Sequence, residues 1–233
     1  LVWCSRRIRN GDQEHLVPLM GVLGAFIFAA QMINFTIPAT GSSGHIGGGL
    51  LLSILLGPYA AIIVIASVLT VQALFFADGG LLALGANIFN LGVLPCFIGY
   101  LLVYRSLLGR PLPGMAPSDR RISIATVLAA VVALQLGALG VVLETQLSGI
   151  SSLPLTTFLL LMQPIHLAIG LVEGLATAAV VLFMRRARPD LFATAPLSAT
   201  ATAASASIKP LLAMVCFAAA LTAGIFSWFA SNR

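Results

Sequence analysis

Long stretches of apolar residues, separated by short polar segments, dominate this chain. Several of these stretches reach the roughly 20 residues that an α-helix needs to cross the hydrocarbon core of a bilayer. The apolar runs occupy residues 16–34, 46–76, 81–104, 122–143, 157–184 and 211–230. This pattern predicts a bundle of membrane-spanning helices.

The run at residues 46–76 is too long for one ordinary span. It contains Gly57 followed by Pro58, and proline breaks a helix or begins a new one. Arginine and lysine in short loops stay on the cytoplasmic side of a membrane. If the chain reverses direction here, every basic residue except Arg233 lies on that side, whereas without the reversal most of them lie outside. We therefore expect one helix to end and another to begin at this point.

The predicted fold class is an all-α integral membrane protein, with a seven-helix bundle and one extra carboxyl-terminal transmembrane helix. The first helix would be largely missing, because Leu1 to Cys4 is typical of the final turn of a helix and Arg6 and Arg7 follow at once. The other six helices of the bundle are expected at residues 16–34, 44–56, 59–76, 81–104, 122–143 and 157–184.

The expected helix at residues 44–56 rises only roughly 20 Å, so it is too short to cross the bilayer unaided. It opens with Gly47, Gly48 and Gly49 and follows a segment, residues 37–45, that has no apolar periodicity. Irregular backbone is tolerated at membrane depth only where protein encloses it. We therefore expect this segment to be a binding loop that dips inward from the outer face.

The composition of the chain changes after Arg188. Small residues with proline and little charge follow, and this composition is typical of a flexible linker. We expect three parts: a membrane domain at residues 1–188, a cytoplasmic linker at residues 189–207 and a transmembrane helix at residues 208–233.

Overall composition supports a lipid environment and excludes several functions. Hydrophobic residues make up 59% of the chain and charged residues 8%, whereas an ordinary soluble domain has about 25% charged residues. The net charge of +5 comes from clusters at helix ends, so nucleic acid is not an expected partner. The chain has no phosphate-cradling G-x-x-x-x-G-K-[ST] motif, so we do not expect it to hydrolyse ATP itself.

A few polar side chains in or beside the apolar runs are candidates for chemistry. His45 ends the expected loop, and imidazole is the commonest metal ligand in proteins. His166 and Glu173 are seven residues apart on one helical face, where they could pair, form a polar stripe, or contact a ligand or a subunit. Asn87 and Asn90 share a face and are expected mainly to form hydrogen bonds between helices.

Five short motifs, in order, resemble the CbiM/NikM family. They are NFTIP at residues 34–38, GSSGHIGG at 41–48, LLGP at 55–58, QALFFADGG at 72–80 and LGANIFN at 84–90. The resemblance covers about residues 16–186. Members of this family are the substrate-capture (S) subunits of energy-coupling-factor transporters for cobalt and nickel.

The resemblance implies a seven-helix body that is not an enzyme and has no cofactor. Such a protein captures Co²⁺ or Ni²⁺ at the outer face of a bacterial plasma (inner) membrane. The ion would be held by nitrogen atoms of a mature amino terminus that begins Met-His, and by His45. Since Leu1 corresponds to a position well down the family's first helix, the site would be incomplete in these residues. The remaining polar candidates, expected to support the site or the fold, are Ser43, Asn87, Asn90, His166 and Glu173.

The resemblance also implies partners. A CbiQ/NikQ-like transmembrane coupling subunit and CbiO/NikO-like ATPase subunits would join this chain in an uptake complex, surrounded by membrane lipid. The helix expected at residues 208–233 resembles the small CbiN/NikN accessory subunit, which some members carry fused.

Two other functions stay open on the residues themselves. The chain could be an intramembrane enzyme that uses His166, Glu173 and Asn90 as acid–base groups. It could also be a structural membrane subunit, in which the histidine loop only packs against a partner. The sequence does not distinguish cobalt from nickel.

Overall fold

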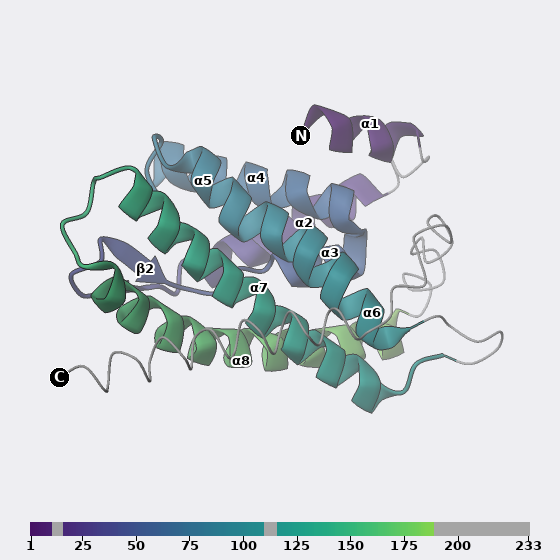
Figure 1. Ribbon diagram of the computed structural model, residues 1–233. Coiled ribbons are helices and arrows are strands. Elements are labelled where there is room, and N and C mark those ends of the chain that lie inside the picture. Colours follow the sequence, from purple (N-terminus) through teal and green to yellow (C-terminus); the bar gives the residue numbers. More distant parts are fainter. Residues whose placement is uncertain (11–15, 110–115, 189–233) are drawn as a thin grey trace. The chain divides into compact units, whose positions relative to one another are not determined.

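The computed structural model describes residues 1–10, 16–109 and 116–188, so the predicted linker at 189–207 and the predicted helix at 208–233 lie outside the described residues. The elements are α1 (Val2–Asn10), α2 (Val17–Gln31), β1 (Phe35–Ile37), β2 (Ser42–Gly44), α3 (Gly49–Leu56), α4 (Pro58–Phe75), α5 (Leu84–Ile88), the π-helix η2 (Phe89–Tyr104), α6 (Arg105–Leu108), α7 (Asp119–Leu147) and α8 (Leu155–Ala187) (Figure 1). Because α5, η2 and α6 run on as one helix, the described residues form seven helices.

Four of the described helices are long and apolar enough to cross a bilayer. They are Pro58–Phe75, Leu84–Leu108, Asp119–Leu147 and Leu155–Ala187. Each coincides, within a few residues, with a helix expected from the apolar runs. Large apolar side chains such as Leu175 and Phe183 are exposed on the outside of α8, where lipid would cover them. The chain is therefore a multi-pass helical membrane protein, as the sequence predicts.

The predicted break between two helices at Gly57 is confirmed. Gly57 has φ 81° and ψ 159°, outside the helical region, and Pro58 is the first residue of α4. Helices α3 and α4 pack against each other, which consecutive helices can do only when the chain turns between them. All eight residues of α3 are buried, so this short helix is enclosed by protein.

The predicted start of the short helix at residue 44 is wrong, because α3 begins at Gly49. Strands β1 and β2 precede it as an antiparallel hairpin in which Thr36 is opposite Ser43. Thr40 Oγ1 closes the turn by donating to the carbonyl of Ile37 at 2.8 Å. Strands of three residues are too short for alternation to be read in a sequence. The hairpin leaves the α-helical class of the fold unchanged.

Helix α1 extends past the single final turn expected at residues 1–4 and has nine residues. The guanidinium carbon of Arg7 lies 5.5 Å from the ring centroid of Trp3 and 6.0 Å from that of Tyr59. Tyr59 belongs to the first turn of α4. This cation–π contact therefore holds α1 beside the turn between α3 and α4.

The helix expected at residues 81–104 begins at Leu84 and is not uniformly α-helical. Its main part, η2, is a π-helix, in which each N–H bonds to the carbonyl five residues earlier. Pro95 lies inside this part, and proline has no backbone N–H to donate. Apolar patterning does not distinguish π from α geometry, so the sequence gives no sign of this change. Stretches of π-helix are frequent at functional sites.

Helices α7 and α8 lie side by side and form the most extensive helix pair of the bundle (Figure 1). Two glycines of α8 allow the close approach. A Cβ added at Gly170 would lie 3.0 Å from Cα of Val131, and one added at Gly174 would lie 2.7 Å from Cα of Val127. Small residues are typical of such interfaces in membranes, where dispersion contacts replace the hydrophobic effect.

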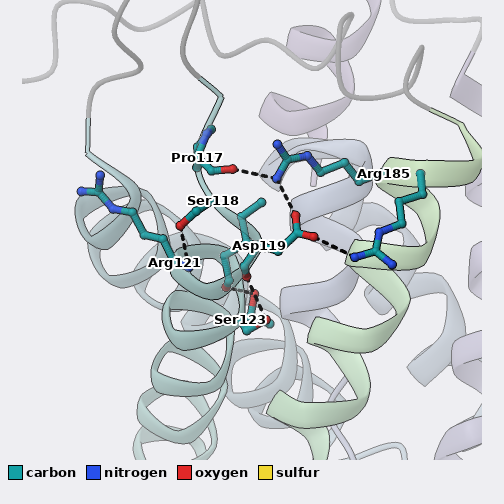
Figure 2. A network of polar contacts seen from close by, with 9 residues as sticks. Pro117, Ser118, Asp119, Arg121, Ser123 and Arg185 are labelled. Carbon is teal, nitrogen blue, oxygen red and sulfur yellow. Dashed lines mark hydrogen bonds and ion pairs between the residues drawn. The ribbon is translucent and has the colours of Figure 1, made fainter.

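Asp119, the first residue of α7, is joined to the last turn of α8 (Figure 2). Its carboxylate oxygens accept from Arg185 Nη1 at 3.2 Å and from Arg186 Nη2 at 2.8 Å. Arg185 also donates to the carbonyl of Pro117 at 2.8 Å. Because these ion pairs are exposed to solvent, they fix the geometry of the chain here more than they add stability.

The close approach of α7 and α8 gives a first prediction. Gly174→Ala should lower the thermal stability of the protein in detergent, by about 1–3 kcal/mol, because the added methyl group meets the backbone of α7. Gly21→Ala is the matched control, since nothing lies within 4 Å of the added Cβ there. Thermal unfolding of both variants is the measurement. Equal melting temperatures would contradict the packing argument.

Candidate metal site

A cavity of about 810 Å³ lies among the hairpin and helices α4, η2, α7 and α8. Its wall contains His45 and His166 and three acidic residues, Asp78, Glu144 and Glu173. No lysine or arginine of the described residues lines it. A cavity with carboxylates and without basic groups attracts cations, because its apolar walls screen charge less than water does.

Glu173, near the middle of α8, binds the loop that carries His45. The Glu173 side chain is buried, and its two carboxylate oxygens accept from the backbone N–H groups of Gly47 at 2.6 Å and Gly48 at 2.9 Å. A carboxylate inside a membrane protein needs such partners. Of the possibilities left open by the sequence, pairing with His166 is not observed.

Two buried glutamines complete this network from the opposite side. Gln31 Nε2 donates to the carbonyl of Gly47 at 2.7 Å, and Gln72 Nε2 donates to Gln31 Oε1 at 2.9 Å. The peptide groups around Gly47 are therefore held by α2, α4 and α8 together. Sequence reasoning missed Gln31, although its signal was available: a polar residue within the apolar run at residues 16–34 needs a partner.

The three consecutive glycines let the chain pass between these helices. A Cβ at Gly48 would lie 2.6 Å from Cδ1 of Ile27, and one at Gly49 would lie 2.7 Å from the carbonyl of Leu91. Gly48 also has φ +76°, a backbone conformation that residues with a side chain rarely adopt. The sequence motif thus reflects a tight passage from the loop into α3.

His45 lies on the cavity wall, half-buried, two residues before the tightly held Gly47. Its Nδ1 is 2.8 Å from the carbonyl of Ile46. A carbonyl only accepts, so Nδ1 carries the proton in this contact, and Nε2 of the neutral ring keeps a lone pair. Ser43, in β2, lines the same cavity. The arrangement leaves one imidazole nitrogen available for a metal ion.

Asn87 and Asn90 have different roles. Asn87 Nδ2 donates to the carbonyl of Gly79, so it closes the local segment before α5 rather than joining two helices as expected. Asn90 Nδ2 donates to Glu144 Oε2 at 2.8 Å and does join η2 to α7. Glu144 was missed by sequence reasoning, because it directly follows the apolar run at residues 122–143 and looks like the end of a span.

The described residues do not contain a complete metal shell. Within residues 1–10, 16–109 and 116–188, no three histidine, cysteine, aspartate or glutamate side chains lie close enough together to hold an ion. Cys4 and Cys96 are both buried, free thiols. The described residues therefore do not by themselves form the nitrogen-rich site that the family resemblance implies.

The contacts of Glu173 give a second prediction. Glu173→Ala leaves the amides of Gly47 and Gly48 without an acceptor, at a cost of about 1–3 kcal/mol each. Backbone hydrogen exchange in the loop should rise, as measured by mass spectrometry. Thr126→Val, which removes a buried hydroxyl that donates to the carbonyl of Ile122 and makes no contact with the loop in the hydrogen bonds of the described residues, should leave exchange in the loop unchanged. Unchanged exchange in the Glu173 variant would show that the carboxylate does not hold the loop.

Comparison with known proteins identifies the family of this chain. A family model described as cobalt uptake substrate-specific transmembrane region matches residues 1–191. A NikMN protein of Archaeoglobus fulgidus is 39% identical over 204 residues, which are 86% of this chain and 65% of the relative. The cobalt transport protein CbiM of Sorangium cellulosum is 31% identical over 188 residues, 79% of this chain and 80% of the relative. The fused nickel transport protein NikMN of Rhodobacter capsulatus is 32% identical, and the chain covers 55% of it. The chain thus spans less than two thirds of these two NikMN relatives.

Two solved structures of transition-metal transporters have a fold similar to that of this chain. The crystal structure of a truncated transition-metal transporter superimposes with a TM-score of 0.68 at 30% identity, covering 80% of this chain and 88% of that one. A second structure, of a transition-metal transporter, has a TM-score of 0.67 at 31% identity. This chain therefore belongs to the family of cobalt uptake substrate-specific transmembrane regions, a family of membrane transport proteins.

Proposed function

We propose that this chain captures Co²⁺ or Ni²⁺ at the outer face of the membrane and passes the ion to an ATP-driven energy-coupling-factor uptake complex. The observation that carries the proposal is His45, which keeps the lone pair of Nε2 and lines a cavity with three acidic residues and no basic ones among the described residues. Imidazole nitrogen is a suitable ligand for Co²⁺ and Ni²⁺. The carboxylates raise the concentration of any divalent cation in the cavity above that in the surrounding water.

The other metal ligands in this proposal come from a Met-His amino terminus. The family resemblance assigns the remaining nitrogens to such a segment, and the 233 residues contain no Met-His pair. A planar set of nitrogens that includes a terminal amine suits Ni²⁺ or low-spin Co²⁺ better than Zn²⁺, which prefers tetrahedral surroundings. The incoming amino-terminal segment would occupy the cavity beside His45.

The proposed domain arrangement follows the family. Residues 1–188 form the seven-helix S-component-like body, residues 189–207 a linker, and residues 208–233 a CbiN/NikN-like transmembrane helix. The partners in the proposal are a CbiQ/NikQ-like coupling subunit in the membrane and CbiO/NikO-like ATPase subunits inside the cell. This division of labour accords with the lack of a phosphate-binding motif in the chain.

The contacts of Glu173 argue against an intramembrane enzyme. Each oxygen of its carboxylate accepts from a backbone N–H group, so the carboxylate holds the loop and is not paired with an acid–base partner. Asn90 is bonded to Glu144, and His166 Nδ1 lies 2.8 Å from the carbonyl of Met162. These side chains organise the cavity instead of forming an acid–base pair.

The proposed role of His45 gives a third prediction. In a protein extended with an amino-terminal Met-His segment, isothermal titration with Ni²⁺ or Co²⁺ should show binding heat. His45→Ala should abolish it or weaken the affinity by at least about 100-fold, since one ligand is lost from the shell. His15→Ala, the same exchange outside the described residues, is the control for adventitious binding to histidine.

Two outcomes would contradict the proposal. An extended protein that binds neither ion would remove the capture function. An extended His45→Ala protein with unchanged affinity would favour a structural subunit in which the hairpin and its loop only pack against a partner.

A further inference from the structure

The loop that carries His45 lies along α8 at two points. On one side of His45, a Cβ added at Gly44 would lie 2.9 Å from Cδ1 of Ile169. On the other side, Gly47 is bonded to Glu173. His45 is therefore held against the stretch of α8 between these two residues. His166 precedes Ile169 by three residues, so it lies on the same face of α8, about one turn nearer to Leu155.

His166 and His45 expose the same ring nitrogen. In His166, Nδ1 is 2.8 Å from the carbonyl of Met162, and in His45 it is 2.8 Å from the carbonyl of Ile46. Each carbonyl can only accept a hydrogen bond, so in both neutral rings Nδ1 is the donor and Nε2 keeps its lone pair. A backbone carbonyl on Nδ1 is the usual device that fixes this tautomer in metal-binding histidines.

Nε2 of His166 is open to the cavity. The His166 side chain is only 9% exposed, and it lines the cavity together with His45. Among the described residues, Asn90 Oδ1 is the one side-chain nitrogen or oxygen that is both inaccessible to solvent and without a hydrogen-bond partner. Nε2 of His166 does not share this condition, although no hydrogen bond of the described residues involves it, so it is accessible from the cavity.

We propose that His166 is a second imidazole ligand, and that Nε2 of His166 and Nε2 of His45 together hold a divalent transition-metal ion in this cavity. The inference rests on the proposed function, because it takes His45 as a metal ligand. It goes further by assigning a direct contact to His166, which the resemblance leaves as a supporting residue. Imidazole nitrogens bind Co²⁺, Ni²⁺ and Cu²⁺ and discriminate against Mg²⁺ and Ca²⁺.

A site with two protein nitrogens suits an ion in transit. Water completes its coordination, so the ion exchanges ligands more readily than it would in a closed shell of four protein nitrogens. Passage through a membrane protein requires binding that is favourable enough to admit the ion and weak enough to release it. Because the amino-terminal nitrogens are not part of this pair, the pair can receive an ion without them.

Counting imidazoles on a bound ion tests the proposal directly. The probe is Cu²⁺, which binds imidazole more tightly than Ni²⁺ or Co²⁺ and has an electron spin. Pulsed electron paramagnetic resonance of the full 233-residue chain in detergent reports how many imidazole rings coordinate the ion. All proteins carry His15→Asn, so that His45 and His166 are the only histidines left. We expect two imidazoles in this background and one after either His45→Asn or His166→Asn.

The outcomes separate this proposal from the function on which it rests. One imidazole in the background protein, lost with His45→Asn, would overturn the role of His166 and leave the capture function intact. One imidazole lost only with His166→Asn would overturn the assignment of His45, and with it both proposals. No imidazole at all would overturn the two-imidazole site and leave intact the capture function, which relies on the amino-terminal nitrogens as well.

A conservative variant distinguishes a ligand from a structural side chain. The amide of His166→Gln can still donate to the carbonyl of Met162, so a purely structural role should be rescued, with folding and affinity for Cu²⁺ both like the background protein. A ligand role predicts normal folding with one imidazole missing, and affinity for Cu²⁺ weaker by at least about tenfold. An affinity for Cu²⁺ equal to that of the background protein would overturn the proposal.

Discussion

The two hydrogen bonds between Glu173 and the loop after His45 are the interaction on which the cavity depends. Backbone outside regular secondary structure is tolerated at membrane depth only when its polar groups find partners in the protein. Here Gly47 and Gly48 donate to one buried carboxylate, and Gln31 donates to the carbonyl of Gly47. Without these partners, the loop would have to move to the membrane surface and His45 would leave the cavity.

The same network explains why α3 is short and fully enclosed. The hairpin and the glycine turn occupy most of the segment before the break at Gly57, so few residues remain there for a helix. The glycines allow α2, η2 and α8 to close around the start of α3, and the apolar side chains of α3 then fill the centre of the bundle. Polar contacts thus set the position of the loop, and apolar packing sets the position of α3.

In the proposed function, the cavity combines two tasks that call for different chemistry. Carboxylates at Asp78 and Glu144 raise the local concentration of cations without choosing among them. Nitrogen ligands make the choice, because imidazole favours later transition metals over Mg²⁺ and Ca²⁺. A transport protein gains from this separation, since attraction and selection occur within one cavity while no single group binds the ion too tightly to release it.

Much of the fold could be read from the sequence, because the bilayer imposes strong local rules. The apolar runs predict, to within a few residues, the positions of the four described helices that are long enough to span a bilayer, and charge placement together with Pro58 predicts the break at Gly57. The motif around His45 also identifies the family. Span length and loop charge can be read from neighbouring residues alone, because a continuous segment of the chain enters the lipid as a unit.

The tertiary structure alone decided which polar groups meet. Glu173 bonds to residues 125 and 126 positions away, and Gln72 to one 41 positions away. Periodicity places such a side chain on a face of its own helix, but it does not say which backbone group will lie opposite. The hairpin, the π-helix and the open Nε2 of His166 likewise depend on how the helices pack. The sequence therefore determined the spans and pointed to the loop that carries His45, while packing in three dimensions determined how that loop is held.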